Sequence, residues 1–152
     1  MTFKFHDENV IPTGDWIYVF SSNLAGKHAK GKARIARVNF RAEFGVAQGR
    51  TSNAYAIPTH DKHMAALSID SIKAAIEAFL RYAHENQKLN FFVTRIGCED
   101  SAFSDEQMGP LFASAPENCS LPRSWKIYAH GKSSSFVEVS AGVPSVTLHQ
   151  LR

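Results

Sequence analysis

The chain has 152 residues, of which 44% are hydrophobic and 20% charged, and its formal net charge is +3. This length predicts one domain with a sizeable core, and the composition excludes disordered, collagen-like and coiled-coil proteins. Its apolar runs are shorter than the ~18–20 residues of a membrane helix, so no membrane partner is expected. The first ten residues have no apolar signal-peptide core, and two cysteines are too few for a disulfide scaffold. These features predict a cytoplasmic protein.

The positive charge is concentrated in one segment. Residues 27–41 contain no Asp or Glu but six cations, namely Lys27, Lys30, Lys32, Arg34, Arg37 and Arg41. Such a patch attracts phosphates, nucleic acid or an acidic protein surface. A solvated helix face is the alternative interpretation, and both remain open.

The first elements expected are a buried strand over 16–20 and an amphipathic helix. The apolar side of this helix is built from Ala29, Ala33, Ala36, Phe40 and Phe44, whose spacings are helical. Gly45 follows at once and suits a helix C-terminus. The cations Lys30, Arg34, Arg37 and Arg41 repeat in the same rhythm and predict a basic stripe beside the apolar side.

Two more strands and two more helices follow. A strand over 54–57 is expected to stop at Pro58, and a strong helix is expected over 69–83. The third strand is expected over 89–96. Ser104 and Gln107 resemble a capping box that opens another helix, which Pro110 should kink or shorten.

This alternation of strands and helices predicts a mostly parallel sheet with helices on both faces. Ligands of such sheets bind beyond the carboxyl ends of the strands. We therefore expect a cleft between two loops, 21–31 and 97–104.

Five segments in this order are similar to a family of small bacterial and phage proteins with a macrodomain-like fold. They are VFSSNLAGKHAKGKA, YAIPTHD, FFVTRIGC, DEQMGPLF and NCSLPRSW, within residues 16–125. The resemblance implies a three-layer α/β domain over 1–125, with a mostly parallel or mixed sheet and helices on both faces. It also implies binding of ADP-ribose or a related NAD-derived nucleotide, and in some members hydrolysis of an ADP-ribosyl linkage. The cytoplasm would be that of a bacterium or of a phage-infected cell.

The same resemblance implies a set of site residues. Asn23 matches the first-loop Asn of the family, whose amide could hold a ribose hydroxyl or the attacking water, and is the expected catalytic residue. The expected ligand-binding residues are Ser22, Asn23, Gly26, His28, Gly31, Gly97, Cys98 and Glu99. The alternative for Asn23 is a cap on the following helix.

The sequence departs from the family where the ligand would bind. Lys30 and Lys32 stand in the first loop, and Glu99 and Asp100 replace small residues after Cys98. Two carboxylates would repel a pyrophosphate. The alternative function is therefore a catalytically inactive macrodomain-like protein, for example a phage-encoded inhibitor or an assembly subunit, that acts through protein contacts. Nucleic-acid binding ranks lower because the basic segment lacks interleaved aromatic residues for base stacking.

The remaining chemistry-bearing residues have ordinary interpretations. His60 and His63 lack further ligands at metal spacing, so no metal site is expected, and no cofactor is expected either. Cys98 is interpreted as a buried structural thiol rather than a nucleophile. Glu99 and Asp100 are either a general-base pair or a solvated acidic loop.

Residues 126–152 lie beyond the resemblance and are expected to form a β-rich extension packed on the same domain. Strands are expected over 126–129, 136–139 and 146–151, because these segments are too apolar for a free tail. They would either extend the sheet or pair with a second subunit, and a homo-oligomer is slightly favoured.

Overall fold

The computed structural model describes residues 3–100, 102–128, 135–139 and 146–150. Its strands are β1 Phe3–His6, β2 Trp16–Asn23, β3 Gly49–Thr51, β4 Ala54–His60, β5 Asn90–Val93, β6 Cys119–Pro122, β7 Ser135–Val139 and β8 Val146–Gln150. Its helices are α1 Gly31–Phe40, α2 Ile69–Glu85 and α3 Asp105–Met108, with 3₁₀ turns η1 Gly109–Phe112 and η2 Arg123–Tyr128.

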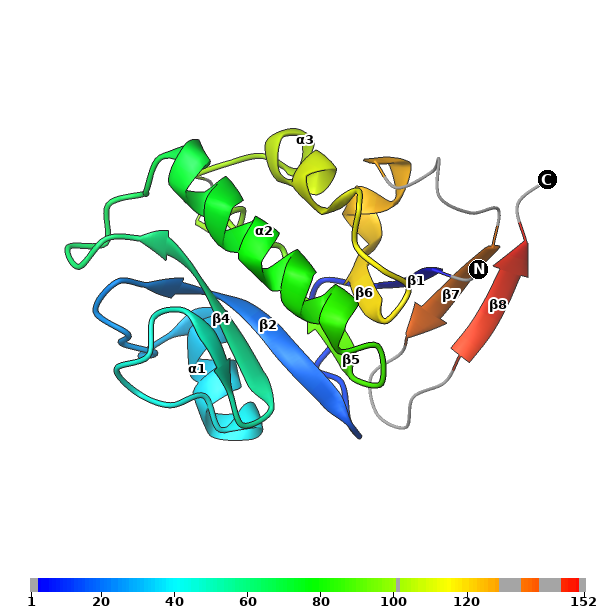
Figure 1. Ribbon diagram of the computed structural model, residues 1–152, viewed down its shortest axis with the longest axis horizontal. Helices are drawn as coiled ribbons and strands as arrows, with labels where there is room; N and C mark the ends of the chain where they lie inside the picture. Colours follow the sequence, from blue (N-terminus) through cyan, green and yellow to red (C-terminus); the bar gives the residue numbers. More distant parts are fainter. Residues whose placement is uncertain (1–2, 101, 129–134, 140–145, 151–152) are drawn as a thin grey trace.

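All eight strands form one sheet in the order β3-β4-β2-β5-β6-β1-β7-β8. The six inner strands run parallel to one another, whereas β3 and β8 pair antiparallel at the two edges. This arrangement, seen in Figure 1, confirms the expected mixed, mostly parallel α/β sheet.

Helices cover both faces of the sheet (Figure 1). Helix α1 packs on one face through Phe40, which stacks on Tyr18 at 4.5 Å between ring centroids. On the other face α2 buries Ile72, Ile76 and Phe79 against the larger core cluster. The two separate clusters of buried side chains make the fold three-layered.

Helix α1 is shorter than the apolar spacing predicted. It ends at Phe40 because Arg41 adopts a left-handed conformation, with φ 62°. The chain then turns back, and the Asn53 N–H donates to the Phe40 carbonyl at 3.1 Å. The prediction that Phe44 belongs to the buried side is wrong, since its side chain is 64% exposed.

Strand β4 runs through Pro58, where the sequence predicts an end. Pro58 pairs with Ser22 of β2 on one side. On its other side β3 pairs only with residues 54–56, so no ladder bond there requires the missing Pro58 N–H. A proline is tolerated in a strand where its nitrogen meets no partner strand.

Three short strands, β1, β3 and β6, have no counterpart among the expected elements. Each spans three or four residues, which is too short for a period to emerge. The expected strand over 89–96 is trimmed to β5, because the Ile96 N–H bonds to the Thr94 carbonyl at 2.7 Å in a tight turn. The capping box of α3 is confirmed, with both Ser104 and Gln107 bonds present.

In the C-terminal part, the strand expected over 126–129 is wrong, because residues through Tyr128 form η2 and Ala129 lies outside the described residues. Trp125 of this turn is fully buried and stacks on Phe112 at 4.9 Å. The other two expected strands are present as β7 and β8. Strand β7 pairs with β1, and β8 pairs with β7, so both extend the sheet of the same chain. Within the described part of the chain, no helix is long and apolar enough to cross a membrane.

Candidate functional site

A cavity of about 490 Å³ lies between the two expected loops, beyond the carboxyl ends of β4, β2 and β5. It is lined by Ser21, Ser22, Asn23, Lys27, Ala29, Lys30, Gly31, Lys32, Ala33, His60, Met64, Gly97, Glu99 and Asp100. The three strands are parallel neighbours, so their ends meet at one edge of the sheet and bring these segments together. The size falls within the ~300–1,000 Å³ range of small-molecule sites.

The end of β2 holds the surrounding loops in place. The Gly97 N–H donates to Ser21 Oγ at 3.1 Å, which ties the loop after β5 to β2. The Leu24 N–H donates to the His60 carbonyl at 3.0 Å, which ties the loop after β2 to β4. The floor of the cavity is therefore built by hydrogen bonds among all three strand ends.

One wall of the cavity is basic and contains the start of α1. Lys27, Lys30 and Lys32 line it, and Lys32 Nζ donates to the Glu8 carbonyl at 2.7 Å. The N-cap residue Lys30 is extended and makes no side-chain capping bond. Unsatisfied N–H groups and the helix dipole make such a helix start attractive to anions.

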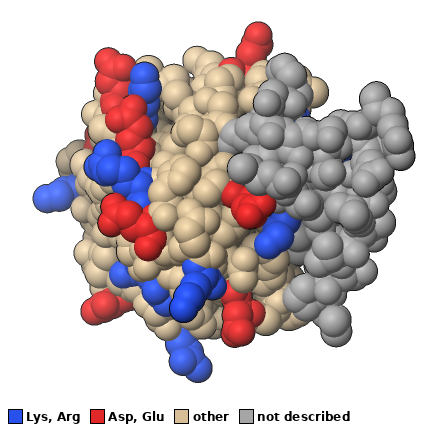
Figure 2. Space-filling view, turned by 45° about the vertical axis from the view of Figure 1, so that its right-hand side comes forward, with Lys and Arg blue, Asp and Glu red and all other residues tan. Residues whose placement is uncertain are grey.

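The basic stripe continues along α1, away from the cavity. Arg34, Arg37 and Arg41 are exposed, as the helical rhythm predicted. In contrast, the face shown in Figure 2 carries Lys and Arg intermingled with Asp and Glu. The basic segment therefore begins with three lysines at the cavity and continues along α1 with arginines outside it.

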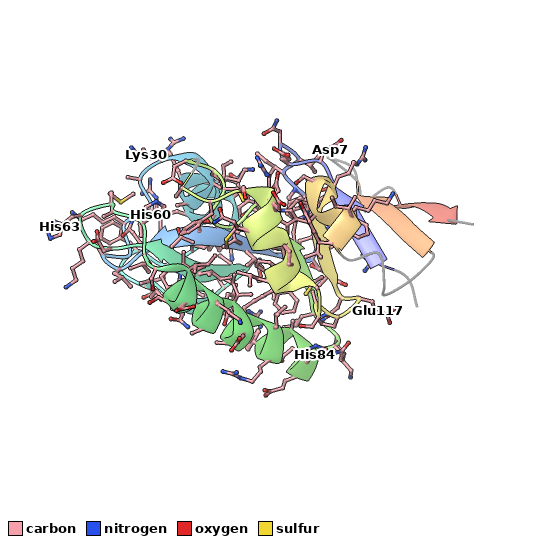
Figure 3. All side chains as sticks on the ribbon, turned by 90° about the horizontal axis from the view of Figure 1, so that it is seen from above. Asp7, Lys30, His60, His63, His84 and Glu117 are labelled. Atoms are coloured by element: carbon pink, nitrogen blue, oxygen red, sulfur yellow. The ribbon has the colours of Figure 1, made fainter. Side chains whose placement is uncertain are left out.

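The other wall is acidic and comes from the loop after β5. His60 Nε2 contacts Asp100 Oδ2, and His60 Nδ1 lies 2.8 Å from Thr59 Oγ1. In the view of Figure 3, His60 and Lys30 lie at the same end of the molecule, with His63 farther out. Partial desolvation in the cavity wall raises the pKa of the Glu99 carboxylate, while Lys32 and Arg95 oppose this rise.

Asn23 lines the cavity, but its amide is engaged within its own loop. The side-chain oxygen accepts from the Ala25 and Lys27 N–H groups at 3.1 and 3.2 Å. The side-chain nitrogen donates to the Lys27 carbonyl at 2.9 Å. Asn23 therefore shapes the loop. It is not the cap of the following helix, because α1 begins after Lys30.

Of the other expected ligand-binding residues, Ser22, Gly31, Gly97 and Glu99 also line the cavity. The remaining three have different surroundings. Gly26 has φ +67°, and a Cβ there would lie 2.4 Å from the Gly45 carbonyl carbon. His28 is buried edge-on against Phe20, and this burial lowers its pKa.

Cys98 lies in the larger core cluster and does not line the cavity. Its side chain is 6% exposed, and burial raises its pKa to about 12. The reactive form of a cysteine is the thiolate, so this environment favours an inert thiol.

The loop after β5 is anchored behind the cavity by an ionic network. Arg95 donates two bonds to the Asp105 carboxylate, at 2.9 and 2.7 Å, and pairs with Glu8 at 3.0 Å. Asp105 also accepts from Trp125 Nε1 at 2.7 Å. Partial burial raises the pKa of Asp105, but hydrogen bonds from Arg95 and Trp125 outweigh it and leave the pKa lowered. These bonds fix the loop that carries Glu99 and Asp100.

Six lining residues with polar or charged side chains were not among the expected ligand residues: Ser21, Lys27, Lys30, Lys32, His60 and Asp100. Their positions at the ends of β2 and β4 and in the loops after β2 and β5 were the available signal. Met64, which also lines the cavity, is held at φ 67° by a turn in which Asp61 accepts from the His63 and Ala65 N–H groups. Among the described residues, no three His, Cys, Asp or Glu side chains gather as metal ligands would.

Comparison with known proteins identifies the fold. No protein-family model and no curated protein matches the chain. The solved macrodomain of Mycobacterium tuberculosis DarG superimposes with a TM-score of 0.59 at 14% identity, over 80% of this chain and 97% of that one. A crystal structure of a Bacteroides thetaiotaomicron protein matches with a TM-score of 0.48 at 12% identity, over 80% of this chain and 99% of that one. The chain therefore has a macrodomain-like fold, as its motifs predicted.

Proposed function

We propose that the cavity binds ADP-ribose or a related NAD-derived nucleotide. The observation that carries this proposal is the position of the cavity in a macrodomain-like fold, with the start of α1 and three lysines forming one wall. An uncapped helix start beside cations suits a pyrophosphate, which brings two negative charges and many acceptor oxygens.

The backbone at this wall leaves room for phosphate oxygens. Gly31 is the first residue of α1, has φ +61°, and has nothing within 4 Å of where a Cβ would stand. A ligand can thus approach the main chain closely at this point. The acidic wall does not cancel the attraction, because three lysines line the cavity against two carboxylates, and Glu99 lies in the field of Lys32.

The proposal concerns binding rather than hydrolysis. Hydrolysis needs a group that orients or deprotonates water, and the Asn23 amide oxygen already accepts two backbone N–H groups. Asn23 is accordingly assigned as a positioning residue for the first loop. The alternative function, an inactive protein that acts through protein contacts, requires no nucleotide affinity, and this difference can be measured.

Isothermal titration calorimetry with ADP-ribose, NAD and ADP tests the proposal directly. We expect saturable binding that weakens with salt, and a thermal shift corresponding to about 2.7 kcal/mol at 100 times the Kd. Lys30→Gln should weaken binding several-fold. Arg37→Gln, on the same stripe but outside the cavity, is the matched control and should change little. Absence of binding by the wild-type protein to all three ligands would contradict the proposal and favour the alternative.

A further inference from the structure

A hydrogen-bonded chain of three side chains crosses the cavity rim. Thr59 Oγ1 lies 2.8 Å from His60 Nδ1, and His60 Nε2 contacts Asp100 Oδ2. A carboxylate only accepts hydrogen bonds, so Nε2 donates to Asp100, and the contact of Nδ1 with the Thr59 hydroxyl fixes the orientation of the imidazole. The contact joins the ends of β4 and β5, the two strands that flank β2.

Asp100 is fixed but not saturated. Its Oδ1 accepts from the Ala102 N–H at 3.2 Å, and its Oδ2 is held by His60. A carboxylate offers about four acceptor positions, so roughly two remain free. The Asp100 side chain is 52% exposed and lines the cavity, whereas the His60 side chain is 12% exposed. An oriented acceptor with spare capacity therefore stands at the cavity wall.

The basic and acidic walls of the cavity favour different chemical groups of a ligand. Phosphates are attracted to Lys27, Lys30 and Lys32 and repelled by Asp100. An amine would be repelled by the same three lysines. The chemical group that suits Asp100 is therefore an uncharged hydrogen-bond donor at the other end of an anionic ligand. Vicinal sugar hydroxyls fit this description, because a carboxylate can accept from both.

We propose that Asp100, held by His60, accepts hydrogen bonds from the hydroxyls of a terminal ribose whose pyrophosphate lies at the start of α1. This inference rests on the proposed function and adds the orientation of the ligand. It also adds a selection rule: an adenine nucleotide whose pyrophosphate carries an unphosphorylated terminal sugar binds better than one that ends in phosphate.

Calorimetric titration of the full chain with ADP-ribose and with ADP, which lacks the terminal ribose, tests the inference. The wild-type protein should bind ADP-ribose at least about tenfold more tightly than ADP. Asp100→Asn should weaken ADP-ribose binding about tenfold and leave ADP binding unchanged or improved. His60→Gln should act in the same direction but less, because it only loosens the carboxylate.

Glu106→Gln is the matched control, since it removes the same charge from an exposed residue of α3 that does not line the cavity. It should preserve the affinity for both ligands. Equal effects of Glu106→Gln and Asp100→Asn, or equal affinity of the wild-type protein for ADP and ADP-ribose, would overturn the inference and leave nucleotide binding intact. Binding of neither ligand by the wild-type protein would overturn the proposed function and this inference together. Thermal unfolding of each variant verifies that it is folded.

Discussion

His6 and His60 are both hydrogen-bonded through both ring nitrogens, but His6 lies in the protein interior and His60 lies at the rim of the cavity. His6 is 1% exposed, with Nδ1 2.6 Å from Ser120 Oγ and Nε2 2.9 Å from the Val93 carbonyl. Its partners are as buried as it is. His60 instead holds a carboxylate that is half exposed at a cavity.

The difference separates polar groups that serve the fold from those available to a ligand. The interior cluster around His6 is closed, because every acceptor and donor of the imidazole meets protein. The cavity rim is open, because Asp100 keeps acceptor positions that protein does not fill. Substitutions in the closed region should therefore change stability, and substitutions at the rim should change binding.

The largest effect is expected at His6. His6→Ala removes a ring stacked on Phe92 at 3.6 Å and leaves Ser120 Oγ and the Val93 carbonyl buried without this partner. Its free energy of unfolding should fall by about 3–5 kcal/mol, as for other buried rings. Urea denaturation measures this loss. His63→Ala, at an exposed position, is the control, and equal losses in the two variants would break the comparison.

The closed environment of His6 also predicts acid sensitivity. Burial lowers the pKa of His6 from 6.5 to about 3. Between these pH values the imidazole is protonated in the unfolded chain and neutral in the folded chain. This contribution to stability is complete above pH 6.5 and is lost as the pH falls toward 3, by up to about 1.4 kcal/mol per pH unit. NMR titration should show a neutral His6 imidazole at pH 5. A midpoint near 6.5 would refute this prediction.

Gly26 and Gly31 extend the comparison between buried and open positions to the first loop. Both have a positive φ, but only Gly26 lies against other backbone atoms. Gly26→Ala would place a Cβ 2.4 Å from the Gly45 backbone and should cost about 3 kcal/mol of unfolding free energy or prevent folding. Gly31→Ala meets nothing within 4 Å and should cost only about 1 kcal/mol, from backbone conformation alone. Thermal or urea unfolding compares the pair, and equal costs would show that the close approach at Gly26 is not tight.

Asn23 combines features of both regions, since it lines the cavity but its side chain is hydrogen-bonded within its own loop. Asn23→Ala should lower the unfolding free energy by about 1–2 kcal/mol, through the loss of bonds to Ala25 and Lys27. It should also weaken ADP-ribose binding, because Lys27 and the start of α1 would lose their anchor. Asn39→Ala, on the exposed side of α1, is the control. Loss of binding with unchanged stability would instead assign Asn23 to direct ligand contact.

Elements that depend on local interactions are predictable from the sequence. Neighbouring residues set the apolar period of α2 and the capping box at Ser104. The alternation of strands and helices along the chain predicts the mostly parallel sheet. The sequence motifs also predicted the macrodomain-like fold. The strand ends pointed to a cleft between loops 21–31 and 97–104, because parallel strands bring their carboxyl ends to one edge.

Only the tertiary structure decided which side chains face the cavity. His60 and Asp100 are 40 residues apart, and their contact exists because β4 and β5 flank β2 in the sheet. The end of α1 at Arg41 and the passage of β4 through Pro58 likewise depend on distant segments, the return of Asn53 and the shortness of β3. Sequence patterns reflect interactions between residues that are close along the chain. The burial and position of each side chain are instead set by packing between elements that are remote in sequence.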